Sequence, residues 1–434
     1  MLDLIWRLPA YRLFRSFGYP RMLPMSLTVS VTYNCNSRCK TCKIYERQAE
    51  HMSVAQYEKI FSTLGYSPRW ITISGGEPFL REDLPEICAA IYNQCRPAVI
   101  NIPTNGLLHR KIPSALEAIT ASCPEAKIIV NLSLDAVGPE HDEIRGVAGN
   151  YEKAIKAYYG LKELQRSGVE NLSLGIHTVI SRFNVSSISD MVPALLALEP
   201  DSYITEIAEN RLELKTVDLD ITPTAKEYEV AIDFVMNMIS RRGFTGVGRI
   251  IQSFRLEYYK HVKSLLFDKP ARWPCYAGFA SGQIMPDGEV WECCIKGNSM
   301  GNLQQADYDF RRVWFSDQAE QIRKTIKGSN CQCPLANAAY TNMLLHPPTL
   351  GRVAIRALFM KGKKNLARMS HKSPSRDRGE GCATGSSQGV GVEAYLESTS
   401  QGELVLSQAE GTPEDAREDA HIRGRSRRLV KYPG

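Results

Sequence analysis

The chain has 434 residues, of which 43% are hydrophobic and 23% charged, a composition typical of soluble globular proteins with two or three domains. A formal net charge of +6 is small for this length and argues against a dedicated nucleic-acid-binding protein. No apolar run reaches the roughly 18 residues that a membrane-spanning helix needs.

Residues 1–26 form an N-terminal segment that combines basic and large apolar side chains. These residues are Trp6, Arg7, Tyr11, Arg12, Phe14 and Arg15. The segment lacks the continuous apolar core and the small-residue cleavage site of a signal peptide, so we expect a cytoplasmic protein. The pattern fits either a helix packed on the edge of a domain or an amphipathic helix that makes peripheral contact with a membrane.

Residues 27–245 alternate between strand-like and helical patterns. The expected strands are residues 27–32, 70–75, 98–105, 127–135, 171–181 and 202–209. Strands that are joined by helical crossovers build a parallel sheet, and six such units predict an α/β fold with an open or partial (β/α)6 barrel. In such sheets the chemistry takes place at the C-terminal ends of the strands.

The loop after the first expected strand contains the sequence "NCNSRCKTC", which places Cys35, Cys39 and Cys42 in a C-x3-C-x2-C pattern. Three thiolates leave one position of a metal site open. A [4Fe–4S] cluster with three protein ligands would keep one iron free, whereas zinc would need a further ligand such as His51. The spacing alone leaves both alternatives open.

"CNSRCKTC" resembles the signature of radical S-adenosylmethionine (SAM) enzymes. The resemblance implies that the open iron of a [4Fe–4S] cluster binds the amino and carboxylate groups of SAM. It also implies that an electron donor such as flavodoxin or ferredoxin drives reductive cleavage to methionine and a 5′-deoxyadenosyl radical. One departure is Thr41, which stands where the family often has an aromatic residue.

Further motifs at the expected strand ends support this resemblance. "ISGGEPFL" resembles the Gly-Gly-Glu-Pro element of the family, in which glycines allow close approach of a ligand and a carboxylate accepts from the SAM ammonium. The residues that the resemblance assigns to SAM binding are Gly75, Gly76, Glu77, Pro78, Asn105, Ser133, Asp135 and Arg145. Ser133 and Asp135 suit the ribose or methionine portion, and Arg145 suits the carboxylate, although such residues also cap and bridge loops. His177 on the fifth expected strand fits an adenine contact or a filler of the barrel interior equally well.

A second group of cysteines lies between 275 and 333. Its members are Cys275, Cys293, Cys294, Cys331 and Cys333. The "PDG" turn that ends at Gly288 predicts a hairpin that returns the chain towards Cys275. The arrangement resembles the SPASM and twitch extensions of radical SAM enzymes, which carry auxiliary iron–sulfur clusters. These extensions begin with the pattern C-x9-15-G-x4-C, which Cys275, Gly288 and Cys293 match. The resemblance implies one auxiliary [4Fe–4S] cluster on Cys275, Cys293, Cys331 and Cys333, with Cys294 either left over or substituting for Cys293; a structural zinc site is the alternative.

The predicted domains are a partial barrel at 27–245, a small cysteine-rich α+β extension at 246–340 and a basic amphipathic helix at 341–368. The composition after residue 369 predicts a disordered tail, 369–434.

The leading interpretation of function is a radical SAM enzyme that abstracts a hydrogen atom from its substrate. The auxiliary cluster would accept an electron or help to bind the substrate. Only 34 residues precede Cys35, which is short for a peptide-recognition domain, so we expect a small molecule, a sugar or a lipid-linked substrate. A peptide-modifying maturase and a non-catalytic metal-binding protein are the alternatives.

Overall fold

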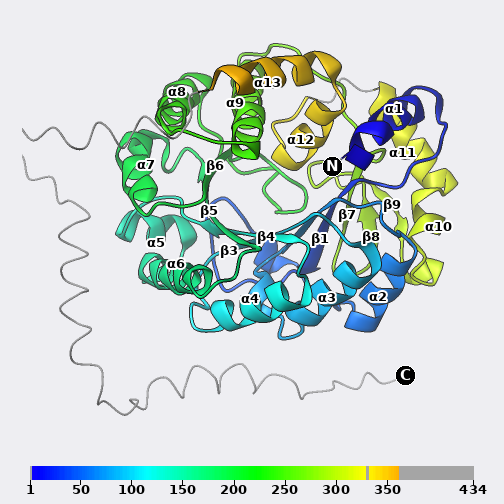
Figure 1. Ribbon diagram of the computed structural model, residues 1–434, viewed down its shortest axis with the longest axis horizontal. Helices are drawn as coiled ribbons and strands as arrows, with labels where there is room; N and C mark the ends of the chain where they lie inside the picture. Colours follow the sequence, from blue (N-terminus) through cyan, green and yellow to red (C-terminus); the bar gives the residue numbers. More distant parts are fainter. Residues whose placement is uncertain (1, 329–331, 361–434) are drawn as a thin grey trace, which may run out of the picture. The chain divides into compact units, whose positions relative to one another are not determined.

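The computed structural model describes residues 2–328 and 332–360, with side chains from residue 7 onward (Figure 1). Cys331 and the predicted tail, 369–434, lie outside the described residues. Within the described part, no helix combines the length and the apolar character needed to cross a bilayer.

Six parallel strands form the centre of the fold, in agreement with the prediction. They are β1 (Ser26–Thr32), β2 (Trp70–Gly75), β3 (Val99–Thr104), β4 (Lys127–Ser133), β5 (Leu172–Ile180) and β6 (Ser202–Ile207). The sheet runs in the order β6-β5-β4-β3-β2-β1, so each strand pairs with its neighbours in the chain. β6 and β1 do not pair with each other, which makes this part a partial barrel rather than a closed one.

The two faces of these strands carry different side chains. On β1, Leu27, Val29 and Val31 belong to the main hydrophobic core, while Ser30 between them is hydrogen-bonded to Glu213 and Gln283. Successive residues of a strand point to opposite faces, so the apolar face packs on helices and the polar face lines the barrel interior. Most parallel strands are apolar on both faces. The alternation here therefore indicates an interior that holds polar groups.

Helices cover the outer side of the curved sheet and the side where β6 and β1 remain unpaired (Figure 1). The helices are α1 (Leu2–Phe17), α2 (Val54–Ser62), α3 (Leu84–Cys95), α4 (Lys111–Ser122), α5 (Pro139–Arg145), α6 (Asn150–Arg166), α7 (Ile188–Ala197), α8 (Ala225–Arg241), α9 (Val247–Leu266), α10 (Phe310–Trp314), α11 (Asp317–Gly328), α12 (Ala336–Leu344) and α13 (Pro347–Phe359). α2 and α8 begin with complete capping boxes, Ser53 with Gln56 and Thr224 with Glu227, which fixes where these helices start.

The cysteine-rich extension continues the same sheet. β7 (Ser281–Ile284) pairs in parallel with β1, β8 (Glu289–Trp291) pairs antiparallel with β7, and β9 (Ser299–Asn302) pairs antiparallel with β8. The predicted hairpin is confirmed, with Gly288 at a φ of 83° in its turn. Because β7 covers the free edge of β1, the extension and the barrel share nine hydrogen-bonded strands.

The N-terminal helix α1 packs against the rest of the protein. Among the residues that suggested membrane contact, Tyr11, Arg12, Phe14 and Arg15 take part in this packing. Tyr11 and Phe14 are fully buried in a second core with Phe279 and Leu345. The Arg12 and Arg15 guanidinium groups donate to the backbone carbonyls of Leu345 and Cys275. Of the two alternatives, packing on the domain edge therefore holds for Tyr11, Phe14, Arg12 and Arg15, which complete the core and support the extension. Leu13 and Phe17 of the same helix remain exposed.

Candidate active site

One cavity of about 190 Å³ lies at the C-terminal ends of the six parallel strands. The structure brings most of the predicted site residues to its wall. These are Cys35, Cys39, Cys42, Gly75, Gly76, Glu77, Asn105, Ser133, Asp135 and Arg145. Pro78 is the exception, because it starts a short 3-10 helix and is buried behind the wall. Thr41 and His177 also line the cavity.

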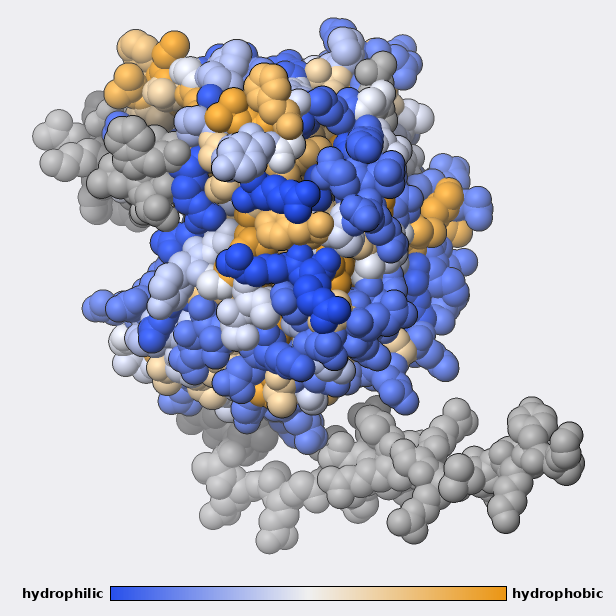
Figure 2. Space-filling model, turned by 90° about the vertical axis from the view of Figure 1, so that its right-hand side faces the viewer, coloured by the Kyte–Doolittle hydropathy of each residue, from blue (hydrophilic) through white to orange (hydrophobic). Residues whose placement is uncertain are grey.

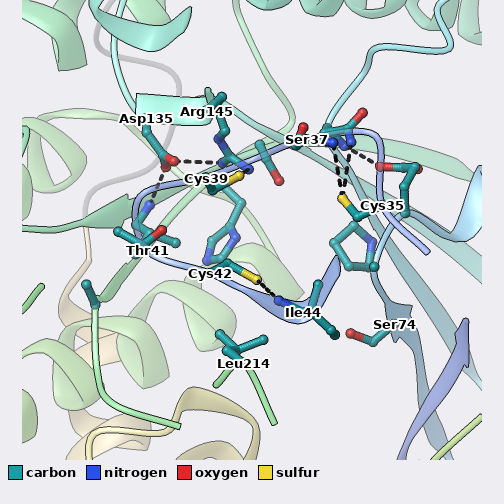
Figure 3. A pocket seen from close by; sticks show the side chains of 18 of the residues that line it. Cys35, Ser37, Cys39, Thr41, Cys42, Ile44, Ser74, Asp135, Arg145 and Leu214 are labelled. Carbon is teal, nitrogen blue, oxygen red and sulfur yellow. Dashed lines mark hydrogen bonds and ion pairs between the residues drawn. The ribbon is translucent and has the colours of Figure 1, made fainter. Parts of the chain in front are cut away.

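The sulfur atoms of Cys35, Cys39 and Cys42 lie at three different places along the cavity wall (Figure 3). N–H groups point at each of them. The backbone amides of Ser37 and Ile44 donate to the Sγ atoms of Cys35 and Cys42 at 3.4 and 3.5 Å, and the Arg145 guanidinium lies 3.9 Å from Sγ of Cys39. Donors around sulfur stabilise thiolates and tune bound clusters, so this donor set fits an iron–sulfur cluster.

The protonation of these thiols depends on a bound cation. Burial raises the pKa of Cys35 to about 11 and that of Cys42 to about 12. Without a positive partner both groups stay protonated at neutral pH, whereas iron displaces the protons and makes the thiolates stable. In the described part of the chain, no three His, Cys, Asp or Glu side chains converge as the ligands of a single metal ion.

The glycines at the end of β2 let the three-cysteine loop approach the sheet. A Cβ on Gly75 would stand 2.2 Å from the Thr32 carbonyl oxygen, and one on Gly76 would stand 2.1 Å from that of Asn34. The amides of Gly76 and Glu77 donate to these same two carbonyls at 2.7 and 2.9 Å. The sequence predicted that these two glycines allow a ligand to come close to the backbone. The structure shows that they also allow the three-cysteine loop to come close to the end of β2.

Glu77 is 1% exposed and joins the ends of β2 and β3. Its carboxylate accepts from the Thr104 hydroxyl and the Asn105 amide, both at 2.8 Å, and from the Phe79 amide at 3.3 Å. Burial raises the pKa of Glu77 to about 7, although these hydrogen bonds oppose the effect. The carboxylate is thus oriented by the protein before any ligand arrives.

Asp135 and Arg145 form a buried ion pair at 2.8 Å beside Cys39. Asp135 also accepts from the Val179 amide at 2.8 Å. The Asp135 carboxylate and the Cys39 sulfur both contact the Arg145 guanidinium. The Nε of Arg145 is buried and has no hydrogen-bond partner among the described residues. Arg145 therefore keeps an N–H group for a further anionic acceptor.

The sequence analysis missed the wall at the end of β6. Arg211 pairs with Glu206 and Glu209 at 3.2 and 2.9 Å, and His177 lies 3.5 Å from Glu206. Burial tends to raise the pKa of Glu206, but His177 and Arg211 outweigh it and lower the pKa to about 2. Burial raises the pKa of Glu209 to about 7 despite Arg211. Polar residues at the expected strand end, in "ITEIAENR", were the available indication.

The second cysteine group is assembled from three segments of the extension. Cys293 and Cys333 border a small apolar cluster that contains the buried Cys294. Cys275 lies close enough to Cys293 for its charge to affect the Cys293 pKa, which burial raises to about 12. Neither Cys293 nor Cys294 forms a disulfide. The donor set again consists of thiols that are at least partly buried, and it fits an iron–sulfur cluster.

A short segment connects the two cysteine groups. Its Leu212 and Glu213 amides donate to the carbonyls of Ile295 and Cys294, each at 3.2 Å. On its other side, the Lys43 amide of the three-cysteine loop donates to the Leu214 carbonyl at 2.9 Å. Arg211, which lines the cavity, comes immediately before this connection.

Two family models match parts of this chain. The family model of the radical SAM superfamily matches residues 29–192, and that of the SPASM iron–sulfur cluster-binding domain matches residues 275–334. A probable GTP 3′,8-cyclase of Methanococcus maripaludis is 32% identical over 215 residues, which cover 48% of this chain and 68% of the cyclase.

The chain belongs to the radical SAM superfamily. This radical SAM enzyme therefore uses a [4Fe–4S] cluster and SAM, and its SPASM domain implies auxiliary iron–sulfur chemistry. It is also similar to the mycofactocin maturase MftC of Mycolicibacterium smegmatis, with 25% identity over 74% of this chain and 78% of MftC. The structure of anSMEcpe with bound AdoMet and Cp18Cys peptide shares the fold, at a TM-score of 0.53 and 14% identity, over 78% of this chain and all of the other.

Proposed function

We propose that this radical SAM enzyme abstracts a hydrogen atom from a polar substrate that lies between the three-cysteine loop and the wall at the end of β6. The observation that carries the proposal is that one cavity contains both sets of residues. The cavity lies at the strand ends where chemistry occurs in such folds.

The SAM side of the proposal rests on the predicted residues. Cys35, Cys39 and Cys42 would hold the cluster. The contacts to SAM would come from Gly75, Gly76, Glu77, Pro78, Asn105, Ser133, Asp135 and Arg145, with Pro78 acting from behind the wall. When bound, the cluster and SAM supply the 5′-deoxyadenosyl radical. The oriented Glu77 carboxylate suits the SAM ammonium, and the unpartnered Nε of Arg145 suits the SAM carboxylate.

The substrate side is the wall of Glu206, Glu209 and Arg211. Arg211 holds both carboxylates in place, so this wall presents a fixed set of acceptors together with His177. A Glu209 pKa of about 7 allows this carboxyl group to donate or accept a hydrogen bond near neutral pH. Hydroxyl and amino groups on a substrate fit such a wall better than an apolar chain does.

The second cysteine group would bind one auxiliary [4Fe–4S] cluster through Cys275, Cys293, Cys331 and Cys333. Its proposed task is to accept an electron from the substrate or to help position it. The segment Leu212–Leu214 supports this role, because it joins the auxiliary site to the cavity through backbone hydrogen bonds. An external donor such as flavodoxin or ferredoxin would reduce the first cluster.

The substrate classes that we propose are small molecules, sugars and lipid-linked compounds with hydroxyl or amino groups. A peptide is the second candidate, and it is favoured by the 25% identity with the maturase MftC over most of both chains. The polar wall can accept either kind of group.

Reductive cleavage of SAM tests the proposed cofactor site. The anaerobically purified enzyme, reduced with dithionite, should form 5′-deoxyadenosine, and a Cys35→Ala, Cys39→Ala, Cys42→Ala variant should form none. Cys382→Ala is the matched control and should keep the activity of the unaltered protein. Formation of 5′-deoxyadenosine by the triple variant would contradict the assignment.

Stimulation by substrate then separates the two substrate classes. A cell extract can be divided by ultrafiltration and protease treatment into small-molecule and peptide fractions. The first candidate predicts faster 5′-deoxyadenosine formation with the protease-resistant small-molecule fraction. Stimulation that is lost on protease treatment would favour a peptide.

A further inference from the structure

The start of α9 and the end of α13 expose an unusual number of large apolar side chains. On α13, Ile355, Leu358 and Phe359 are 60, 77 and 83% exposed. Their spacing of three and four residues places them on one side of the helix. On α9, Ile250 and Ile251 are about half exposed, as is Val247 at its first position. Single exposed apolar residues are ordinary, but a contiguous group marks an interaction surface.

The two groups lie side by side because α9 and α13 pack antiparallel. The Arg356 guanidinium donates to the Ser253 carbonyl at 3.4 Å, and that of Arg352 donates to Glu257 at 3.0 Å. The contacts move towards the start of α9 as α13 proceeds, which brings Phe359 beside the first turns of α9. Figure 2 shows hydrophobic side chains along the upper edge of the molecule, at the height at which Figure 1 draws α13. We call these residues of α9 and α13 the α9–α13 surface.

Positive charge exceeds negative charge next to this surface. Glu257 is buried, and three guanidinium groups surround its carboxylate: Arg356 at 2.7 Å, Arg352 at 3.0 Å and Arg272 at 3.8 Å. Lys260 follows on the same helix, and burial together with the charges of Arg356 and Arg272 lowers its pKa. One carboxylate cannot balance four cations, so the region attracts anions.

The sequence continues this charge beyond the end of α13. Lys361, Lys363 and Lys364 come shortly after Phe359 in the sequence, although they lie outside the described residues. A helix that combines exposed apolar residues with neighbouring lysines and arginines is the arrangement that binds at the surface of an anionic bilayer. α13 has 13 residues and a length of about 20 Å, so it would lie in the plane of the interface.

We propose that the α9–α13 surface docks on an anionic lipid bilayer. The apolar side chains enter the boundary between headgroups and acyl chains, while the surplus cations contact the headgroups. The docking does not depend on the identity of the substrate, and it places the enzyme where a lipid-linked substrate would be presented. Tyr11 and Phe14 of α1 do not share in it, because both are buried in the second core.

Co-sedimentation with vesicles tests this proposal on the full chain, loaded with its clusters. The vesicles are phosphatidylcholine alone or phosphatidylcholine mixed with an equal amount of phosphatidylglycerol. We expect binding to the mixed vesicles that weakens as salt is added. The Leu358→Ser, Phe359→Ser variant should lower the partition coefficient by roughly tenfold per residue. Val230→Ser, which changes a 74% exposed residue of α8, is the matched control and should bind unchanged.

A second variant tests the charge separately. Lys260→Gln with Arg272→Gln should weaken binding to mixed vesicles by roughly fivefold per charge, and Arg352 and Arg356 remain to neutralise Glu257. Cleavage of SAM in solution should be unchanged in both variants, which separates this test from that of the proposed function. Three results would overturn the proposal. The enzyme could bind both vesicle types equally, or it could bind neither. The α9–α13 surface could instead mediate a dimer that is lost in the Leu358→Ser, Phe359→Ser variant.

Discussion

The two cysteine groups of this enzyme differ in how their members are brought together. Cys35, Cys39 and Cys42 come from one loop after β1, whereas Cys275, Cys293 and Cys333 come from segments that precede β7, follow β8 and precede α12. The geometry of the first group is set locally, by a loop that packs on two glycines. The geometry of the second group forms only when the β7–β8 hairpin and α12 have folded. A substitution that disrupts one of the two sites should therefore leave the other intact.

Each group also lies near a buried arginine. Arg145 contacts Cys39 and pairs with Asp135, and the charge of Arg211 acts on Cys294 while Arg211 pairs with two glutamates. A positive charge near a cluster favours its reduced form. The difference between the sites therefore lies in their assembly and in their carboxylate partners. It can be tested at Gly76, at the adjacent Cys293 and Cys294, at Arg211 and at His141.

The largest expected effect is that of Gly76→Val on the first site. The new side chain would meet the Asn34 carbonyl at 2.1 Å from its Cβ, so the three-cysteine loop must move away from β2. We expect loss of SAM cleavage and of the first cluster, with the second cluster retained, as measured by iron content and electron paramagnetic resonance. Gly351→Ala, a glycine with no atom near its Cβ, is the control and should keep both clusters. A Gly76→Val enzyme with full activity would refute the role of this contact.

The second prediction concerns the adjacent Cys293 and Cys294. Gly288 is followed by Cys293 at the spacing expected for a ligand, while Cys294 is buried against Leu335 and Ala338. We expect Cys293→Ala to lose the second cluster and Cys294→Ala to keep it. The iron and sulfide content of each variant, together with the absorbance of the cluster's charge-transfer band, shows which variant has lost the second cluster. The reverse result would make Cys294 the ligand.

A smaller effect is expected from Arg211→Met. Removing this positive charge should lower the reduction potential of the second cluster and leave that of the first nearly unchanged. Arg211→Lys, which keeps the charge, should restore the potential of the unaltered enzyme, and the exposed Arg166→Met is a surface control. Redox titration followed by electron paramagnetic resonance gives both potentials. Equal shifts in the two clusters would show that Arg211 does not distinguish the sites.

The smallest effect concerns the stability of the first site at low pH. His141 is fully buried, accepts from the Asp135 amide at 3.1 Å, and lies 2.6 Å from the Asn150 side-chain oxygen. Burial lowers the pKa of His141 to about 4. The neutral form is the stable one in the fold, so its contribution is present above pH 6.5 and is lost as the pH falls towards 4. The loss amounts to roughly 3 kcal/mol.

Urea unfolding under anaerobic conditions measures this contribution. The unaltered enzyme should lose more stability between pH 6.5 and 4 than His141→Gln does. Parallel loss in the two proteins would assign the acid sensitivity to other groups.

The sequence predicted the barrel well because its strands carry a period of two. "LTVSVT" and "NLSLGIHT" alternate between apolar and polar residues. The loop after β1 is recognisable from its three cysteines within a few positions. These are local signals, and local signals can be read from a sequence.

The wall at the end of β6 and the pairing of β7 with β1 could not be read in this way. Glu206 and Glu209 look like ordinary solvated charges until the fold places Arg211 and His177 beside them. Similarly, the pattern of α1 fits a membrane surface and a protein core equally well. Only the second core, which takes up Tyr11 and Phe14, decides between them.

Iron and sulfide quantitation on the anaerobically purified enzyme tests the central claim, two independent clusters, most directly. The unaltered chain should contain about eight iron atoms, four for each cluster. The Cys35→Ala, Cys39→Ala, Cys42→Ala variant should retain about half of the iron and sulfide and make no 5′-deoxyadenosine. Loss of all iron in this variant, or bound zinc in place of iron in the unaltered chain, would contradict the account.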